Sequence, residues 1–166
     1  VIREGGAAEW VLIYCLAGQG QVLMDDQEMA IGSGDLVVLP PGRPHRYFAD
    51  AEAPWRIFWF HFVGERAEDF VSALGLDEGS WCMHSPAVNE MQRAFEGTYR
   101  HALDGFSDSG MLGLSTSFAR MIGLFRRFAR SRNDRSRDAE DRVHRVMINL
   151  QEQLEREWTV EDMALL

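Results

Sequence analysis

The segment GDLVVLPPGRPHRY, residues 34–47, decides the fold of this 166-residue chain. Its apolar run Leu36–Leu39 predicts a buried strand. Pro40-Pro41-Gly42 ends that strand, because proline has no amide hydrogen to donate to a sheet. A second short strand is predicted at Arg46–Phe48. The segment therefore predicts two strands joined by an irregular, proline-fixed connection.

Short strands and tight turns continue on both sides of this segment. Further strands are predicted at residues 10–16, 21–24, 29–31 and 55–62, where apolar, β-branched and aromatic residues gather. Turn residues separate them, as in Gly18-Gln19-Gly20. Strands this short with turns this close predict a β-sandwich or small barrel over residues 1–63.

After Gly64 the apolar residues repeat with a helical period. A short helix is predicted at residues 65–74, and a second one follows Ser85-Pro86, a cap and a proline at the first helical position. A third helix begins near Met111. The chain is therefore predicted to be α+β, with a helical region at residues 64–130 following the strands.

Two interpretations of the apolar seam on the third helix stay open. The seam consists of Leu114, Phe118, Met121 and Phe125. Its spacing is typical of a helix that packs lengthwise on another. In one interpretation the seam covers the barrel, and in the other it meets a second copy of the chain and forms a homodimer. Both can hold, because the apolar stripe is broader than one seam requires.

Beyond the third helix the composition changes. Residues 131–141 are rich in Arg, Asp and Ser, which predicts a linker. Residues 142–166 contain another amphipathic helix, and Thr159 with Asp162 marks the start of one more. A capped apolar helix with nothing after it predicts that the chain is part of a longer protein.

The charge of the chain is unevenly distributed. It has 17 basic residues, all arginine, against 26 acidic ones, for a net charge of −9. Residues 126–166 hold equal numbers of both, so residues 1–125 carry the negative charge. A negative body repels phosphates, and we expect no nucleic-acid binding by this chain. The arginines of 126–137 fit either a solvated helix end or a phosphate contact.

Membrane and disulfide signals are missing from the sequence. No apolar run approaches the roughly 18–20 residues of a membrane span, and no leader is recognisable at Val1. We therefore expect a cytoplasmic protein with no membrane partner. Cys15 and Cys82 are too few for a disulfide framework or a cysteine-based zinc site, so both are predicted to be buried thiols.

Gly34, Pro40, Gly42 and His45 match the second cupin motif, G-x5-P-x-G-x2-H. With IYCLAGQGQV at 13–22, WRIFWFHFVG at 55–64 and residues 146–166, the chain resembles the AraC/XylS family of bacterial transcription regulators over almost its whole length. The resemblance implies a cupin-like (jelly-roll) barrel that binds a small effector, followed by a helical pair that packs on it and dimerises. It also implies that residues 142–166 begin a helix-turn-helix DNA-binding domain, so DNA binding is expected only of the full-length protein.

The strand predicted at 55–62 supplies a candidate binding wall. Alternation places Trp55, Trp59 and His61 on one face and phenylalanines on the other. An indole wall suits the C–H face of a sugar, and nearby polar groups suit its hydroxyls. The predicted ligand-binding residues are Trp59, Tyr47, His61, Trp55, Tyr14, His45, Arg3 and Trp10. The alternative is that the tryptophan face is simply core.

The resemblance also bears on the effector. Tyr47 and Trp59 fall where a sugar-binding pattern of the family has a contacting tyrosine and a stacking tryptophan. Ala17 and Ile57 stand where that pattern has an arginine and a histidine. The resemblance therefore implies a carbohydrate or a related small polar effector that is held by different polar contacts.

No catalytic arrangement stands out in the sequence. The histidine pair and glutamate of the first cupin motif are missing, and His45 with His61 lacks a carboxylate partner. No metal, cofactor or catalytic residue is therefore predicted, and the chain is expected not to be an enzyme. Two alternatives stay open: a cupin enzyme acting on a sugar or small acid, and a ligand-independent regulator whose barrel is filled by its own side chains.

Overall fold

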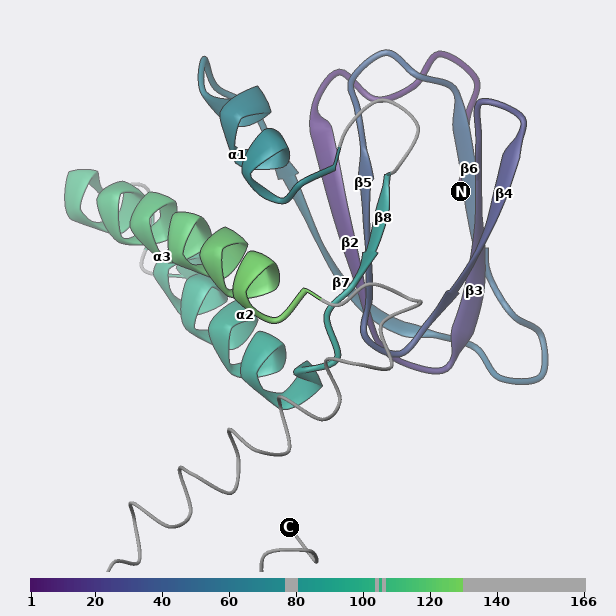
Figure 1. Cartoon of the computed structure of the whole chain (residues 1–166). Helices are drawn as coiled ribbons and strands as arrows, with labels where there is room; N and C mark the ends of the chain where they lie inside the picture. Colours follow the sequence, from purple (N-terminus) through teal and green to yellow (C-terminus); the bar gives the residue numbers. More distant parts are fainter. Residues whose placement is uncertain (77–80, 104, 106, 130–166) are drawn as a thin grey trace, which may run out of the picture. The chain divides into compact units, whose positions relative to one another are not determined.

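A computed structural model describes residues 1–76, 81–103, 105 and 107–129. Two antiparallel sheets face each other, and helices lie beside them (Figure 1). Residues 1–129 form one compact unit, so the sheets and these helices belong to the same body. The linker predicted at 131–141 and the DNA-binding segment predicted at 142–166 lie outside the described residues.

Each sheet has four strands with antiparallel neighbours. The first sheet, in the order β1-β6-β3-β4, contains β1 (Ile2–Arg3), β6 (His45–Ala49), β3 (Gln19–Met24) and β4 (Gln27–Gly32). The second sheet, in the order β7-β2-β5-β8, contains β7 (Arg56–Phe62), β2 (Trp10–Ala17), β5 (Asp35–Leu39) and β8 (Cys82–His84). This arrangement confirms the predicted β-sandwich.

Residues 34–47 carry the chain from one sheet to the other. β5 lies in the second sheet and β6 in the first, so the proline segment between them crosses the sandwich. A second crossing, from β2 to β3, turns at Gly18, where φ is 75°. A Cβ atom at Gly18 would lie 2.3 Å from the carbonyl oxygen of Pro54, so only glycine fits there. Both crossings coincide with predicted Gly and Pro turns.

Aliphatic side chains fill the space between the sheets. The register pairs Val11 with Leu39 and Ile13 with Val37, and these four residues are at most 1% exposed. Val22, from the first sheet, is buried as well. Burying each such side chain stabilises the fold by about 1.5–3 kcal/mol. The sandwich is therefore held by a dry core.

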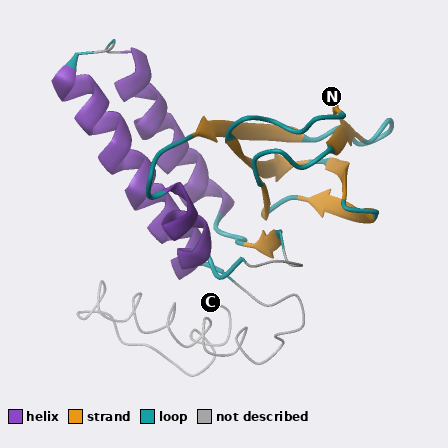
Figure 2. Ribbon diagram, turned by 90° about the horizontal axis from the view of Figure 1, so that it is seen from above, coloured by secondary structure: helices purple, strands orange, loops and turns teal. Residues whose placement is uncertain are grey.

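Helices cover the outer face of the second sheet (Figure 2). They are α1 (Ala67–Ala73), α2 (Val88–Leu103) and α3 (Asp108–Arg127). Ser107 caps α3, because its hydroxyl accepts a hydrogen bond from the amide of Gly110 at 3.1 Å. The three predicted helices are thereby confirmed, and α2 and α3 form an antiparallel hairpin.

The apolar seam of α3 packs on the second sheet. The Phe118 ring centroid lies 5.2 Å from that of Phe60 on β7. Met121 and Phe125 are completely buried, and Leu114 is half-buried. The seam therefore covers the sheet, as the first interpretation has it. The side chains of Met121 and Phe125 are enclosed within this chain, and a dimer contact stays a prediction.

Two short edge strands, β1 and β8, were not predicted. They contain two and three residues, too few to show a period-two pattern in the sequence. Only their pairing with β6 and β5 makes them strands. Within the described part of the chain, no helix has the length and apolar character needed to cross a membrane.

Candidate functional site

The strand β7 presents two chemically different faces. Phe58 stacks on Phe95 of α2 with 4.3 Å between ring centroids, and Phe60 lies 5.3 Å from the same ring. Side chains alternate along a strand, so Trp59 and His61 point the other way, toward the interior of the sandwich. The predicted alternation is confirmed in this strand.

Trp59 is 56% exposed although it lies on the inner face. It occupies an edge strand of the second sheet, where no further strand covers it. His61 follows on the same face, and its Nδ1 lies 3.8 Å from a carboxylate oxygen of Glu9. An accessible indole with a polar neighbour is the chemical arrangement that a sugar-stacking wall needs.

Three rings lie in a row against the inner face of the first sheet, two from β6 and one from Trp55, which precedes β7. His45 and Tyr47 lie in β6 opposite Met24 and Val22, both buried. The ring centroids of His45 and Tyr47 are 6.2 Å apart with an interplanar angle of 13°, and those of Tyr47 and Trp55 are 6.3 Å apart. We call His45, Tyr47 and Trp55 the aromatic row.

Gly20 creates the space that Trp55 occupies. A Cβ atom at Gly20 would lie 2.2 Å from a carbon of the Trp55 ring, far inside van der Waals contact. The glycine is therefore required for the ring to lie against β3. The sequence indicated Gly20 as a turn residue, and this packing role appears only in the structure.

His45 contains a buried acceptor that has no donor. The residue is 5% exposed, and its Nδ1 lies 3.0 Å from the carbonyl oxygen of Arg43. A carbonyl only accepts, so Nδ1 carries the hydrogen, and Nε2 of the neutral ring is an acceptor. Within the described residues Nε2 has no hydrogen-bond partner. A bound hydroxyl group would satisfy it.

A pocket of about 620 Å³ opens beside His45. Arg3 lies next to His45 because β1 pairs with β6. The pocket is also lined by the acidic residues Glu4, Asp25, Asp26 and Glu28. Asp25 pairs with Arg43 across the rim. The structure therefore brings Arg3 and His45, two of the predicted ligand-binding residues, to one polar opening.

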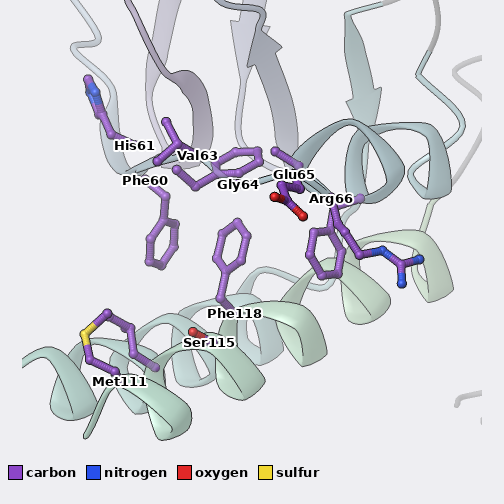
Figure 3. Close-up of a pocket in the computed structure, with 13 residues that line it drawn as sticks. Phe60, His61, Val63, Gly64, Glu65, Arg66, Met111, Ser115 and Phe118 are labelled. Carbon is purple, nitrogen blue, oxygen red and sulfur yellow. The ribbon is translucent and has the colours of Figure 1, made fainter. Parts of the chain in front are cut away.

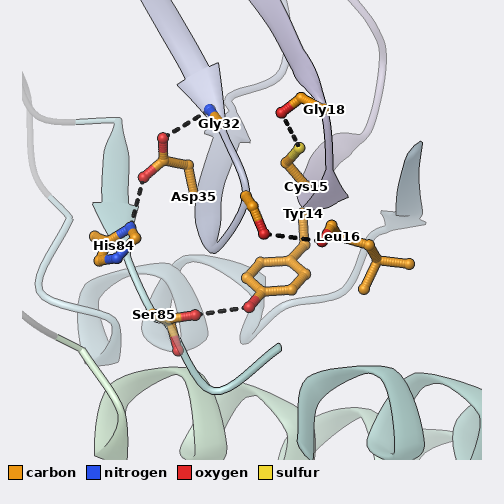
Figure 4. Close-up of polar contacts among 9 residues, drawn as sticks. Tyr14, Cys15, Leu16, Gly18, Gly32, Asp35, His84 and Ser85 are labelled. Carbon is orange, nitrogen blue, oxygen red and sulfur yellow. Dashed lines mark hydrogen bonds and ion pairs between the residues drawn. The ribbon is translucent and has the colours of Figure 1, made fainter. Parts of the chain in front are cut away.

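Trp10 and Tyr14 lie on the opposite face of the second sheet from Trp59. Trp10 stacks on Phe62 with 6.4 Å between ring centroids. Tyr14 is completely buried, and its hydroxyl donates to the carbonyl oxygen of Ser85 at 2.6 Å (Figure 4). Burial raises the pKa of Tyr14 well above its usual range, so the hydroxyl stays protonated. Strand alternation thus places both outside the aromatic row.

A polar bridge that the sequence did not indicate ties β8 to β5. The carboxylate of Asp35 accepts from the amide of Gly32 and lies 2.9 Å from Nδ1 of His84 (Figure 4). Asp35 itself is buried. Because β8 leads into α2, this bridge and the Tyr14–Ser85 hydrogen bond fasten the start of the helical hairpin to the barrel.

Both cysteines are free thiols, and the predicted burial is confirmed for Cys15 but not for Cys82. Cys15 is buried, and burial raises the pKa of its thiol. Cys82 is half-buried in β8. Among the residues that the structure describes, no three His, Cys, Asp or Glu side chains form a group able to hold a metal ion.

Comparison with known proteins finds one matching family model and two curated relatives. The family model for the AraC-like ligand binding domain matches residues 2–145. The chain is 36% identical over 102 residues to the MmsAB operon regulatory protein of Pseudomonas aeruginosa, covering 59% of this chain and 29% of that protein. It is 27% identical over 73 residues to the Msm operon regulatory protein of Streptococcus mutans, covering 44% and 26%. These matches span less than a third of each relative's length.

A solved structure supports the fold. The AraC-like transcriptional activator CuxR matches with a TM-score of 0.51 and 12% identity, covering 97% of this chain and 57% of CuxR. At this identity the likeness concerns the fold alone, and it confirms the cupin-like α+β architecture. The family model covers most of the sequence, including every described strand from β2 to β8. The chain therefore belongs to the family of AraC-like ligand-binding domains.

Proposed function

We propose that this chain is the effector-sensing and dimerisation part of an AraC-type bacterial transcription regulator. Its effector is a carbohydrate or a similar small polyol, bound at His45 and Arg3 with its ring against the aromatic side chains nearby. The observation that carries the proposal is the buried Nε2 of His45, an acceptor without a donor. A buried polar group left unpaired costs about 1–3 kcal/mol, and a hydroxyl group of the effector removes that cost.

The residues around His45 suit a neutral sugar better than an anionic one. Tyr47, Trp55 and Trp59 offer flat apolar surfaces to the C–H faces of a sugar ring. Arg3 offers donors to hydroxyl oxygens at the pocket. The pocket beside His45 is lined by four acidic side chains against two arginines, Arg3 and Arg46, and this excess of negative charge disfavours carboxylates and phosphates. We therefore favour a neutral saccharide over a sugar acid or sugar phosphate.

The names of the two curated relatives support a role in gene regulation. Both curated relatives are operon regulatory proteins by name. In our proposal, effector binding shifts the equilibrium between two arrangements of a cytoplasmic homodimer. DNA is contacted by the helix-turn-helix domain of the full-length protein, whose beginning we assign to residues 142–166. No catalytic step and no metal take part.

A thermal-shift titration of the 166-residue chain with neutral mono- and disaccharides, sugar acids and small aromatic acids tests this proposal. A neutral saccharide at about 100 times its dissociation constant should stabilise the chain by roughly 2.7 kcal/mol. Trp59→Ala should abolish that stabilisation and leave the ligand-free melting temperature nearly unchanged, because Trp59 is largely exposed.

Phe48→Ala is the matched control, since Phe48 is an exposed aromatic residue of β6 whose side chain points to the face opposite Tyr47. It should respond to the saccharide as the unchanged chain does. An unchanged shift in Trp59→Ala would remove Trp59 from the site. A clear melting transition with no response to any saccharide would contradict the carbohydrate assignment.

One observation favours a second candidate, a ligand-independent regulator. The central residues of the sandwich, such as Ile13 and Val37, are completely buried, so part of the interior is filled by the chain itself. In that case a partner protein, and not a small molecule, controls the regulator. The same titration separates the two, because a filled interior predicts no stabilisation by any small molecule in the panel.

A further inference from the structure

A second pocket lies on the helical side of the sheet, away from the aromatic row. It has a volume of about 680 Å³ and lies between the end of β7, the start of α1 and the N-terminal half of α3 (Figure 3). This volume falls in the range typical of small-molecule sites. Its apolar wall is made mainly of phenylalanines, namely Phe60, Phe62, Phe70 and Phe118.

Phe118 is the centre of this wall. Its ring centroid lies 5.2 Å from that of Phe60, 5.0 Å from that of Phe62 and 6.3 Å from that of Phe70. Leu114, one helical turn before Phe118, lines the pocket too. The pocket therefore offers aromatic surface to an apolar ligand body, and ring faces attract cations as well.

The charged groups of the pocket differ in whether they are paired. Arg66 donates through Nε to a carboxylate oxygen of Asp69 at 2.8 Å, and its guanidinium points away from Phe118 (Figure 3). The Glu65 carboxylate points into the pocket, toward Phe118 (Figure 3). Among the described residues, Glu65 has no hydrogen-bond or ion-pair partner. The unpaired charge facing the phenylalanines is therefore negative.

We infer that this pocket binds an organic ammonium ion with an apolar body, such as an aromatic amine. The carboxylate of Glu65 pairs with the ammonium group, and the rings around Phe118 hold the apolar part. The rings add a cation–π attraction to the same group. An anionic ligand of the same size is repelled by Glu65, and a neutral one gains only the apolar contact.

Isothermal titration calorimetry with three probes of similar size tests the inference: 2-phenylethylamine, 2-phenylethanol and phenylacetate. We expect the amine to bind at least fivefold more tightly than the alcohol and the carboxylate. Its affinity should fall as salt is raised, because the ion pair lies near the surface. Equal or tighter binding of phenylacetate, or no binding of the amine at millimolar concentration, overturns the inference.

Three variants locate the site. Glu65→Gln keeps the shape of an exposed side chain, and we expect it to weaken the amine about fivefold without changing the affinity for 2-phenylethanol. Arg66→Gln is the matched control and should not weaken the amine. Trp59→Ala should also leave amine binding unchanged, because Trp59 lies on the opposite face of β7. An unchanged affinity in Glu65→Gln overturns the inference.

Discussion

His45 shows how one imidazole serves both the fold and the proposed site. Its Nδ1 hydrogen is used by the carbonyl of Arg43, which fixes the tautomer and leaves Nε2 as an acceptor. Such a ring is a poor partner for a carboxylate effector and a good one for a hydroxyl. The specificity of the proposed site therefore depends on which of the two imidazole nitrogens is hydrogen-bonded to the backbone carbonyl.

His45→Phe tests this at the scale of a single residue. Phenylalanine keeps the ring and removes the unpaired acceptor, so we expect the free energy of unfolding to change by no more than about 1–2 kcal/mol. The affinity for a saccharide that stabilises the unchanged chain should fall at least tenfold. Urea denaturation and calorimetry measure the two quantities. Unaltered affinity in a folded variant would exclude His45 from the site.

At the scale of the element, the strands β2 and β7 separate the interior of the sandwich from the layer of helices. One face of each contributes to the interior of the sandwich, and the other packs under α2 and α3. The alternation of β7 places Trp59 and Phe58 in different environments although they are neighbours in sequence. Trp59 and Phe60 thus serve the two proposed ligand sites from opposite faces of the same strand, and His61 also lines the second pocket.

Tyr14→Phe tests this separation. The variant loses a buried hydrogen bond to Ser85, so we expect the free energy of unfolding to fall by about 1–2 kcal/mol. Saccharide affinity should stay unchanged, because Tyr14 faces α3 and not the aromatic row. Chemical denaturation with a parallel binding titration gives both values. Weaker saccharide binding with an unchanged free energy of unfolding would instead show that Tyr14 contacts the ligand, as the sequence analysis predicts.

At the scale of the whole molecule, the helical hairpin has an exposed apolar surface. Tyr99 and Leu103 of α2, with Met111 and Leu112 of α3, are exposed. The buried part of the seam is occupied by the sheet, and Met111 and Leu114 line the pocket proposed for the ammonium ligand, so we expect a dimer contact to use Tyr99, Leu103 and Leu112. A monomer would leave this surface in water.

Light scattering at tens of micromolar chain tests the dimer. We expect a dimeric mass for the unchanged chain and a monomeric mass for Leu112→Glu, since Leu112 is 67% exposed on α3. Arg120→Glu, a charge change at another exposed position of α3, is the control and should remain dimeric. Phe125→Ala should act differently, lowering the free energy of unfolding by about 3–5 kcal/mol as a core residue. A monomeric mass for the unchanged chain would contradict the dimer.

The sequence by itself determined the strands from β2 to β7, the three helices and their order. Local signals suffice for these features: Gly and Pro turns, the period of two in 55–62 and the helical period after Gly64. The motif in 34–47, together with the order of the segments at 13–22, 55–64 and 146–166, indicated the family. The alternation along 55–62 also predicted that Trp59 and His61 share one face of the strand.

Only the tertiary structure decided which side chains meet. Trp10 and Tyr14 look like ligand residues by type, but the register of β2 against β7 turns them toward the helices. The burial of His45 against β3 and the position of Glu65 in one pocket with Phe118 depend on contacts between distant segments. The short strands β1 and β8 exist through pairing alone. Such features rest on long-range contacts, which a local pattern does not encode.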